Sequence, residues 1–338
     1  MKKSKCILYI GNNLVKKTGY YTSMETFSGN IEKDNYRVIK YSHQSNQFLR
    51  LLHMCYGVIK HSRSYSHILI DTFSTKSFYY AFATSQVSRL LGKKYIPILR
   101  GGDLPTRIRK SPRLSKMIFN HSYKNVAPSN YLKTAFEKQG YIVDYIPNIL
   151  EIDRYKYKTR EKLKPKLLWV RAFKHLYNPI LAIEVLLLLK EKYPKATLCM
   201  IGPAKDDSFE QVKDKVKTIG LENDVEFTGV LSKEDWHKKA EDCDIFINTT
   251  NFDNTPVSVM EAMALGLPVV STDVGGMPFL IESGIDGILV EKENAEVMSN
   301  EISKLIKNNN VGISKKAREK AESFAWKNVK KKWYQILE

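Results

Sequence analysis

Short apolar runs alternate with longer mixed segments along this chain of 338 residues. In the first half the runs cover residues 6–10, 36–41, 67–71, 94–99 and 125–127. Runs of this length, bounded by polar residues, are typical of buried strands, and the segments between them are long enough for helices. Strands that alternate with helices predict a parallel sheet of the α/β class.

The same pattern begins again in the second half of the chain. A polar, lysine-rich stretch over residues 151–166 lacks periodicity and is interpreted as a linker. After it, strands are expected at 167–170, 197–201, 225–228, 245–248 and 268–271, with helices at 179–193 and 209–219. A chain of this length suits two domains. We therefore predict two Rossmann-like, doubly wound domains, over residues 1–158 and 159–322, and a last helix over 323–338 that packs back on the first domain.

Doubly wound sheets bind their ligands outside the carboxyl ends of the strands, so the central cleft between the two domains is the expected site. No stretch approaches the ~20 apolar residues that a membrane span needs. The four cysteines lack the paired spacing of a zinc site or a disulfide framework, which favours a reducing compartment. We expect a cytoplasmic protein.

The positive charge is confined to one half of the chain. Residues 1–160 hold 28 Lys and Arg against 9 Asp and Glu, whereas residues 161–338 hold 26 against 27. A generally basic proteome would give both halves an excess of positive charge. The asymmetry therefore indicates an anionic partner of the N-terminal domain, either nucleic acid or an anionic membrane surface. The second alternative would place the protein peripherally on the inner face of the membrane.

The segment with the clearest chemistry follows the strand expected at 245–248. There a loop leads into a helix, with Thr255 or Asn254 available as the cap and Pro256 at an early helical position. The start of a helix after a strand is an anion site, because its first amides and its dipole point at the ligand. Asp253 before the helix and Glu261 within it add two acceptors, and the combination suits a sugar nucleotide.

Asp253 and Glu261, separated by seven residues, resemble the acidic signature of the family 4 retaining glycosyltransferases. Residues 266–278, with Gly275-Gly276, and residues 283–290 are similar to the elements that follow that signature. Shorter pieces agree in order along the chain: residues 128–132, 146–148 and 227–229, Arg171 after the strand at 167–170, and Gly202 after Ile201. The resemblance implies the two-domain GT-B fold, with the acceptor on the side of the N-terminal domain (residues 1–158) and the nucleotide sugar bound by the C-terminal domain (residues 159–322).

The resemblance also implies a role for each residue at a matching position. Glu261 would bind the nucleotide ribose, Asp253 would contact hydroxyls of the donor sugar, and Arg171 would neutralise the departing diphosphate. The chain around Pro256, Val257 and Ser258 would offer amides to the phosphates. Lys174 and Gly202 are further donor-binding candidates, and the loop from Gly11 to Gly19 would close over the phosphates from the N-terminal domain.

Each of these residues also has a purely structural interpretation. A glutamate at a helix start can be a dipole partner, an arginine at a strand end a surface ion pair, and Gly19 a turn residue. Their joint order and spacing favour the functional interpretation.

Three positions depart from the family pattern. Asp253 stands where the family usually has glutamate, and residues 176–179 lack the basic residue expected soon after Arg171. Where many relatives place a histidine, this chain has residues 100–103, and Arg100 and Asp103 either line the cleft or pair with each other.

Asp242-Cys243-Asp244 superficially matches the metal-binding triplet of the other large glycosyltransferase class. It precedes a buried strand, so these carboxylates are expected to end a helix, and no metal site is predicted.

The predicted function is retaining transfer of a sugar from a UDP- or GDP-sugar to a glycan or lipid-linked acceptor, in cell-surface polysaccharide synthesis, without metal, further cofactor or nucleic acid. The alternatives are a GT-B epimerase acting on a sugar nucleotide and a basic nucleic-acid-binding protein.

Overall fold

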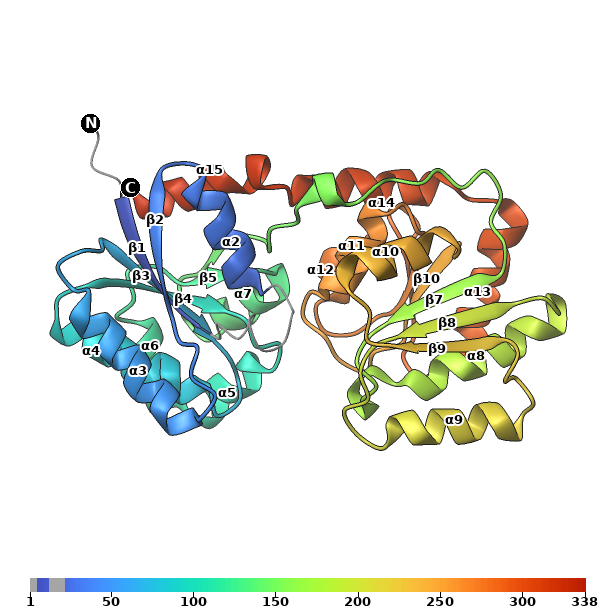
Figure 1. The fold of residues 1–338 in the computed structure, drawn as a ribbon, viewed down its shortest axis with the longest axis horizontal. Helices are drawn as coiled ribbons and strands as arrows, with labels where there is room; N and C mark the ends of the chain where they lie inside the picture. The colour runs from blue at the N-terminus through green and yellow to red at the C-terminus, as the bar shows by residue number, and fades with distance from the viewer. Residues whose placement is uncertain (1–4, 12–21) are drawn as a thin grey trace. The chain divides into compact units, whose positions relative to one another are not determined.

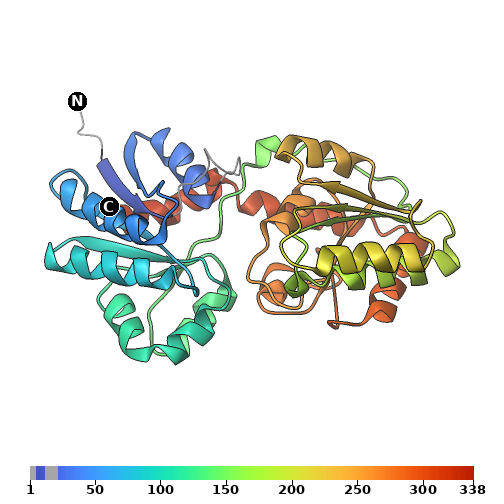
Figure 2. The same cartoon turned by 60° about the horizontal axis from the view of Figure 1, so that its bottom comes forward.

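The computed structural model describes residues 5–11 and 22–338, and its chain divides into two compact units. Unit 1 comprises Met1–Ile149 together with Phe324–Glu338, and unit 2 comprises Leu150–Ser323. Figures 1 and 2 show each unit as a sheet with helices packed on its faces. No helix within the described ranges is both long and apolar enough to span a bilayer.

Unit 1 contains a six-stranded sheet in which every neighbouring pair is parallel, in the order β2-β1-β3-β4-β5-β6. Its strands are β1 (Lys5–Ile10), β2 (Tyr36–Tyr41), β3 (His67–Thr72), β4 (Lys94–Leu99), β5 (Val126–Ala127) and β6 (Asp144–Tyr145). Its helices are α2 (Ser23–Glu32), α3 (Gln47–Lys60), α4 (Phe78–Leu90), α5 (Leu104–Lys110), α6 (Pro112–Phe119), α7 (Asn130–Glu137) and α15 (Trp326–Leu337).

Alternate residues of the strands of unit 1 pack on opposite faces of the sheet. Ile7 and Tyr9 of β1 belong to a core with α2 and the C-terminal helix α15, to which Trp333 contributes. Leu8 and Ile10 belong to a second core with α3 and α4. Because both faces are covered, the strands are continuous apolar runs, which is the pattern that made them predictable.

Unit 2 contains a second all-parallel, six-stranded sheet in the order β12-β11-β10-β7-β8-β9. Its strands are β7 (Lys166–Val170), β8 (Thr197–Ile201), β9 (Val225–Gly229), β10 (Ile245–Asn248), β11 (Val269–Thr272) and β12 (Ile288–Val290). Its helices are α8 (Pro179–Lys192), α9 (Ser208–Thr218), α10 (Lys233–Glu241), α11 (Val257–Ala264), α12 (Met277–Leu280), α13 (Ala295–Asn308) and α14 (Gly312–Ser323), with short 3-10 turns at Ile152–Arg154 and His175–Tyr177.

The segment interpreted as a linker is part of unit 2, so that interpretation was wrong. Tyr155 and Leu163 are buried, and the backbone amide of Lys158 donates to Leu265 O at 3.3 Å. Arg160 is 5% exposed and donates to the backbone carbonyls of five residues, including Cys243 O at 2.9 Å. The division between the units therefore falls at Ile149, nine residues before the expected boundary. Polar composition hid these contacts, because they are made by one arginine and by backbone atoms.

Candidate active site

The loop between β10 and α11 is held in place by hydrogen bonds to two neighbouring elements, β7 and the turn at His175–Tyr177. Trp169 Nε1 of β7 donates to Thr249 Oγ1 at 2.9 Å, and Thr249 Oγ1 donates to the carbonyl of Tyr177 at 2.9 Å. The amide of Asn251 donates to Leu176 O at 2.8 Å. The ends of β7 and β10 and the turn at His175–Tyr177 are thus joined at the carboxyl edge of the sheet.

Two glycines after β11 fix the other side of this loop. The amide of Gly276 donates to Asp253 O at 2.9 Å. A Cβ on Gly275 would overlap Asp253 O, and one on Gly276 would overlap Asn254 O. Only glycine permits this approach of two backbones, which accounts physically for Gly275-Gly276 at this position.

The start of α11 differs in one detail from the sequence prediction. Pro256 is itself the N-cap, with φ −67° and ψ 124°, and the helix begins at Val257, so neither Thr255 nor Asn254 is the cap. Pro256 has no amide to offer, and the first amides of the helix are those of Val257 and Ser258. The hydroxyl oxygens of Thr255 and Ser258 are buried and have no hydrogen-bond partner among the described residues.

Arg171 and Asp253 form an ion pair at the carboxyl edge of the sheet. Their side chains are 15% and 17% exposed, and the guanidinium of Arg171 lies 4.3 Å from the ring centroid of Tyr177. Burial lowers the pKa of Arg171 to about 10, so the guanidinium stays charged at neutral pH. Arg171 Nε is a further buried donor without a partner in the described part of the chain.

Gly202 supports the backbone of Arg171 from the adjacent strand. The amide of Arg171 donates to Ile201 O at 3.0 Å, and that of Gly202 donates to Gly229 O at 2.9 Å. Gly202 has φ +151°, and a Cβ there would overlap the carbonyl oxygen of Arg171. Its contact in the structure is therefore with the residue that was expected to meet the diphosphate, and its own contact with a donor stays a prediction.

Glu261 lies on α11 and is 4% exposed. Its Oε1 accepts the hydroxyl of Tyr155 at 2.7 Å and Lys233 Nζ at 2.8 Å. Burial and the neighbouring carboxylate raise the pKa of Tyr155, so its hydroxyl keeps the proton that it donates. Both hydrogen bonds use Oε1, and none made by the described residues uses Oε2. The carboxylate is thus oriented from one side, with its second oxygen available.

Three residues of this site escaped the sequence analysis. Tyr155 lies in the stretch interpreted as a linker, and Lys233 begins α10, so neither shows a local signal of its contact with Glu261. Tyr177 occupies the stretch where a second basic residue was expected, and its ring faces Arg171 instead.

The remaining predicted residues are placed differently or not described. Lys174 is exposed and makes no contact with Arg171, Asp253 or Glu261 among the described residues. Gly19 lies outside the described residues. Arg100 does not pair with Asp103: its Nε donates to Asp71 Oδ1 at 2.9 Å, and Asp103 is exposed.

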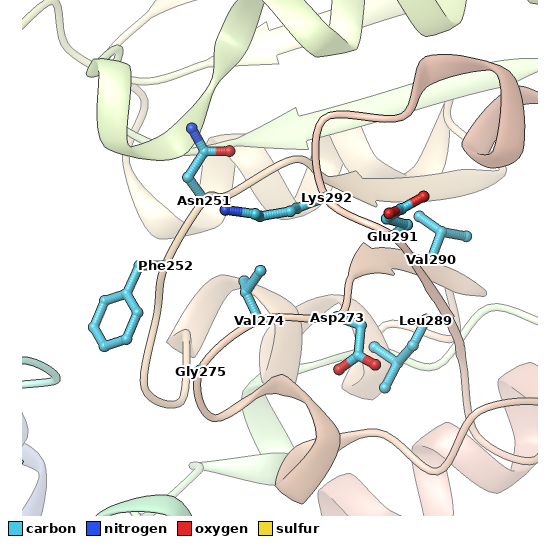
Figure 3. Close-up of a pocket in the computed structure, with 9 residues that line it drawn as sticks. All are labelled: Asn251, Phe252, Asp273, Val274, Gly275, Leu289, Val290, Glu291 and Lys292. Atoms are coloured by element: carbon cyan, nitrogen blue, oxygen red, sulfur yellow. The ribbon is translucent and has the colours of Figure 1, made fainter.

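A cavity of about 580 Å³ adjoins the loop that bears Asp253. Figure 3 shows its lining side chains, which come from the loop after β10, the end of β11 and the end of β12. Asp273 and Glu291 supply carboxylates, and Lys292 supplies an ammonium group. The cavity shows that the carboxyl edge of this sheet is hollowed beside the predicted sugar-contacting residue.

The acidic triplet takes the place predicted for it. Asp242 is the C-cap of α10, and Asp244 Oδ2 accepts the amide of Lys164 at 3.0 Å. Within the described ranges one group of three potential metal ligands comes together elsewhere, namely His175, Asp206 and Asp207, all exposed.

The two sheets and their connections define a GT-B protein. The structure of HepE from Anabaena, in complex with UDP and glucose, superposes with a TM-score of 0.75 at 18% identity and covers 98% of this chain and 99% of its own. Sucrose-phosphate synthase from Thermosynechococcus elongatus gives a TM-score of 0.77 at 14% identity, with 98% of each chain covered. The predicted fold class is confirmed.

The chain belongs to the group 1 glycosyl transferases, whose family model matches residues 151–325, just over half of its length. It is 26% identical over 190 residues to poly(glycerol-phosphate) alpha-glucosyltransferase of Bacillus subtilis, covering 55% of this chain and 26% of the relative. It is 28% identical over 158 residues to the amylovoran biosynthesis glycosyltransferase AmsK of Erwinia amylovora, covering 44% and 38%. The matches thus span between about a quarter and two fifths of these relatives.

Proposed function

We propose that this protein is a family 4, retaining glycosyltransferase that takes a UDP- or GDP-sugar as donor. The observation that carries the proposal is a set of buried donors without partners in the described chain: the hydroxyls of Thr255 and Ser258 at the start of α11, and Nε of Arg171, which pairs with Asp253 on the loop before it. Buried polar groups are almost always hydrogen-bonded, so unpartnered donors at and beside a helix start favour the binding of an anionic ligand. A diphosphate has the charge and the number of acceptors for it.

The donor would be held by the residues around this cluster. The diphosphate would accept from the first amides of α11 and from Arg171, whose forked guanidinium suits two phosphate oxygens. Glu261 would accept ribose hydroxyls through Oε2, with Oε1 held by Tyr155 and Lys233. Asp253 would face the hydroxyls of the sugar. It is one methylene shorter than the usual glutamate, which bears on the choice of sugar.

The chemistry would need no enzymatic nucleophile. The bond between the anomeric carbon and the phosphate oxygen breaks, the acceptor hydroxyl bonds to that carbon from the same face, and the leaving phosphate takes the hydroxyl proton. Arg171 and the amides of α11 would stabilise the charge that grows on the diphosphate, which lowers the barrier more than it tightens ground-state binding.

The acceptor proposed is a glycan or a lipid-linked glycan used in cell-surface polysaccharide synthesis. Support comes from the relatives, since AmsK and WcaL of Escherichia coli are named for the biosynthesis of amylovoran and colanic acid. The basic excess supports a place at an anionic membrane face, on the cytoplasmic side. By structural unit it is sharper still, with 28 Lys and Arg against 8 Asp and Glu in unit 1.

The proposal is tested by incubating the purified protein with a panel of UDP- and GDP-sugars without acceptor and measuring release of free sugar. One donor is expected to be hydrolysed, and its nucleotide should stabilise the protein against heat by ~2.7 kcal/mol at a hundred times the dissociation constant. Isomerised sugar nucleotide in place of free sugar would indicate an epimerase. Stabilisation by RNA but by neither UDP nor GDP would reject the proposal in favour of nucleic-acid binding.

A further inference from the structure

Helix α3 of unit 1 leaves a row of large apolar side chains uncovered. Phe48 is 67% exposed, Leu49 53%, Leu52 51%, Tyr56 53% and Ile59 55%. At ~100° per residue these five positions fall within an arc of about 100° on one side of the helix. We call them the α3 apolar face. Single exposed apolar residues are ordinary, but five on one helix face mark an interaction surface.

The opposite side of α3 fixes the orientation of this face. Met54 and Val58 are buried in the core that they share with Leu8 and Ile10 of β1. A Cβ on Gly57 would overlap the ring of Tyr41, so the helix lies closely against the sheet at this point. The helix cannot turn its apolar face inward without losing this packing, and the face therefore points away from the unit.

Basic groups lie beside exposed rings on α3 and on the neighbouring helix α4. Lys60 Nζ lies 5.4 Å from the ring centroid of Tyr56, and Arg63 just beyond the helix is exposed. On α4, which packs against α3, Tyr79 is 48% exposed with the guanidinium of Arg107 5.8 Å from its ring centroid. Apolar side chains beside Lys and Arg are the composition of a helix that lies in a membrane interface.

The topology places this face beside the expected acceptor region of unit 1. α3 follows β2 and α5 follows β4, so both helices begin at the carboxyl edge of the same parallel sheet. Figure 1 labels both helices on unit 1. Ligands of such sheets bind at the carboxyl edge. A partner bound to the α3 apolar face would therefore lie close to an acceptor bound at this edge.

We propose that the α3 apolar face inserts into the interface of an anionic lipid bilayer and docks unit 1 there. This inference rests on the proposed function for its purpose, the presentation of a lipid-linked acceptor. The apolar side chains would enter the boundary between headgroups and acyl chains, while the basic excess of unit 1 holds the anionic headgroups. Insertion of apolar side chains and attraction to anionic headgroups act together. The protein should therefore bind weakly to neutral vesicles, and a variant without the exposed apolar side chains of α3 should bind weakly to anionic vesicles.

The test is sedimentation of the full chain with vesicles of phosphatidylcholine alone and of phosphatidylcholine with phosphatidylglycerol. The test variant is Leu52→Ser/Ile59→Ser. The matched control is Ile142→Ser/Leu187→Ser, which removes the same two residue types from exposed positions, 82% and 40%, outside α3. We expect the wild type and the control to bind anionic vesicles, and the test variant to lose ~10-fold or more in partitioning.

Equal loss in the test variant and the control, or equal wild-type binding to neutral and anionic vesicles, would overturn the proposal. Loss of a wild-type dimer in the test variant, seen by light scattering and without vesicle binding, would assign the face to a second copy of the chain instead. Donor hydrolysis measured without vesicles keeps the two proposals apart. Vesicle binding through α3 by a protein that hydrolyses no sugar nucleotide would leave the docking surface standing and remove the proposed function.

Discussion

Replacing Arg171 with alanine separates a catalytic charge from a structural ion pair. In the structure Arg171 pairs with Asp253, and both side chains are largely buried. Breaking a buried pair by removing one partner costs ~3–5 kcal/mol. Because each side chain keeps some contact with solvent, we expect a smaller loss, ~1–3 kcal/mol in the free energy of unfolding. Turnover at saturating donor should fall by ~100-fold or more, since a donor to the developing charge is lost.

The double variant Arg171→Ala/Asp253→Asn distinguishes these two effects. It leaves no unpaired carboxylate, so urea denaturation should show stability close to that of the wild type. Turnover should stay low, because the diphosphate still lacks its guanidinium and the sugar hydroxyls have lost the Asp253 carboxylate. Arg171→Lys keeps the positive charge but not the forked guanidinium, so its turnover should lie between that of the wild type and that of Arg171→Ala. The assay is donor hydrolysis on protein shown to be folded by circular dichroism. Wild-type turnover in folded Arg171→Ala, or recovery of turnover in the double variant, would refute the assignment of the phosphate site.

Three further predictions concern the donor site and its support. Glu261→Gln should weaken donor binding, measured by calorimetry, by ~1.5–3 kcal/mol with little change in turnover at saturation, and an unchanged dissociation constant would argue against ribose contact. Lys233→Met removes one of the two donors that orient Glu261, and the Lys233 side chain is half exposed, so donor binding should weaken by a smaller amount, ~1 kcal/mol. Binding as tight as in the wild type would show that Tyr155 alone is enough to orient Glu261. EDTA should leave hydrolysis largely intact, and a complete loss that Mn2+ or Mg2+ restores would require a metal.

The sequence predicted ten of the twelve strands, because parallel strands that are covered on both faces are continuous apolar runs. It missed β6, which has two residues, and the short β12 appeared only as a segment of family resemblance. The length of β6 is not the reason, because β5 also has two residues and was predicted. Both residues of β5 are apolar and buried, whereas Asp144 and Tyr145 of β6 are only partly buried and form no apolar run. The loop after β10, the start of α11 and the glycine pair follow one another in the sequence, so the predicted anion site could be located without knowledge of the fold.

Tertiary structure alone decided which side chains meet at the site. Tyr155 and Glu261 are 106 positions apart, and no local pattern marks a tyrosine that will donate to a distant carboxylate. Arg100 pairs with Asp71 and not with Asp103, although Asp103 is closer in sequence. The reason is that β3 and β4 are neighbours in the sheet, whereas Asp103 is exposed at the start of α5.

Which side of α3 is exposed also depends on tertiary structure. Apolar residues occur on both sides of this helix, and the sequence alone does not tell which side is covered. Packing of Met54 and Val58 against β1 buries one side, and that burial leaves Phe48, Leu52 and Ile59 exposed. Local sequence thus determines where strands and helices form, because their periodicity is a property of neighbouring residues. Partners and exposed faces depend on contacts between segments far apart in the chain, which only the folded structure specifies.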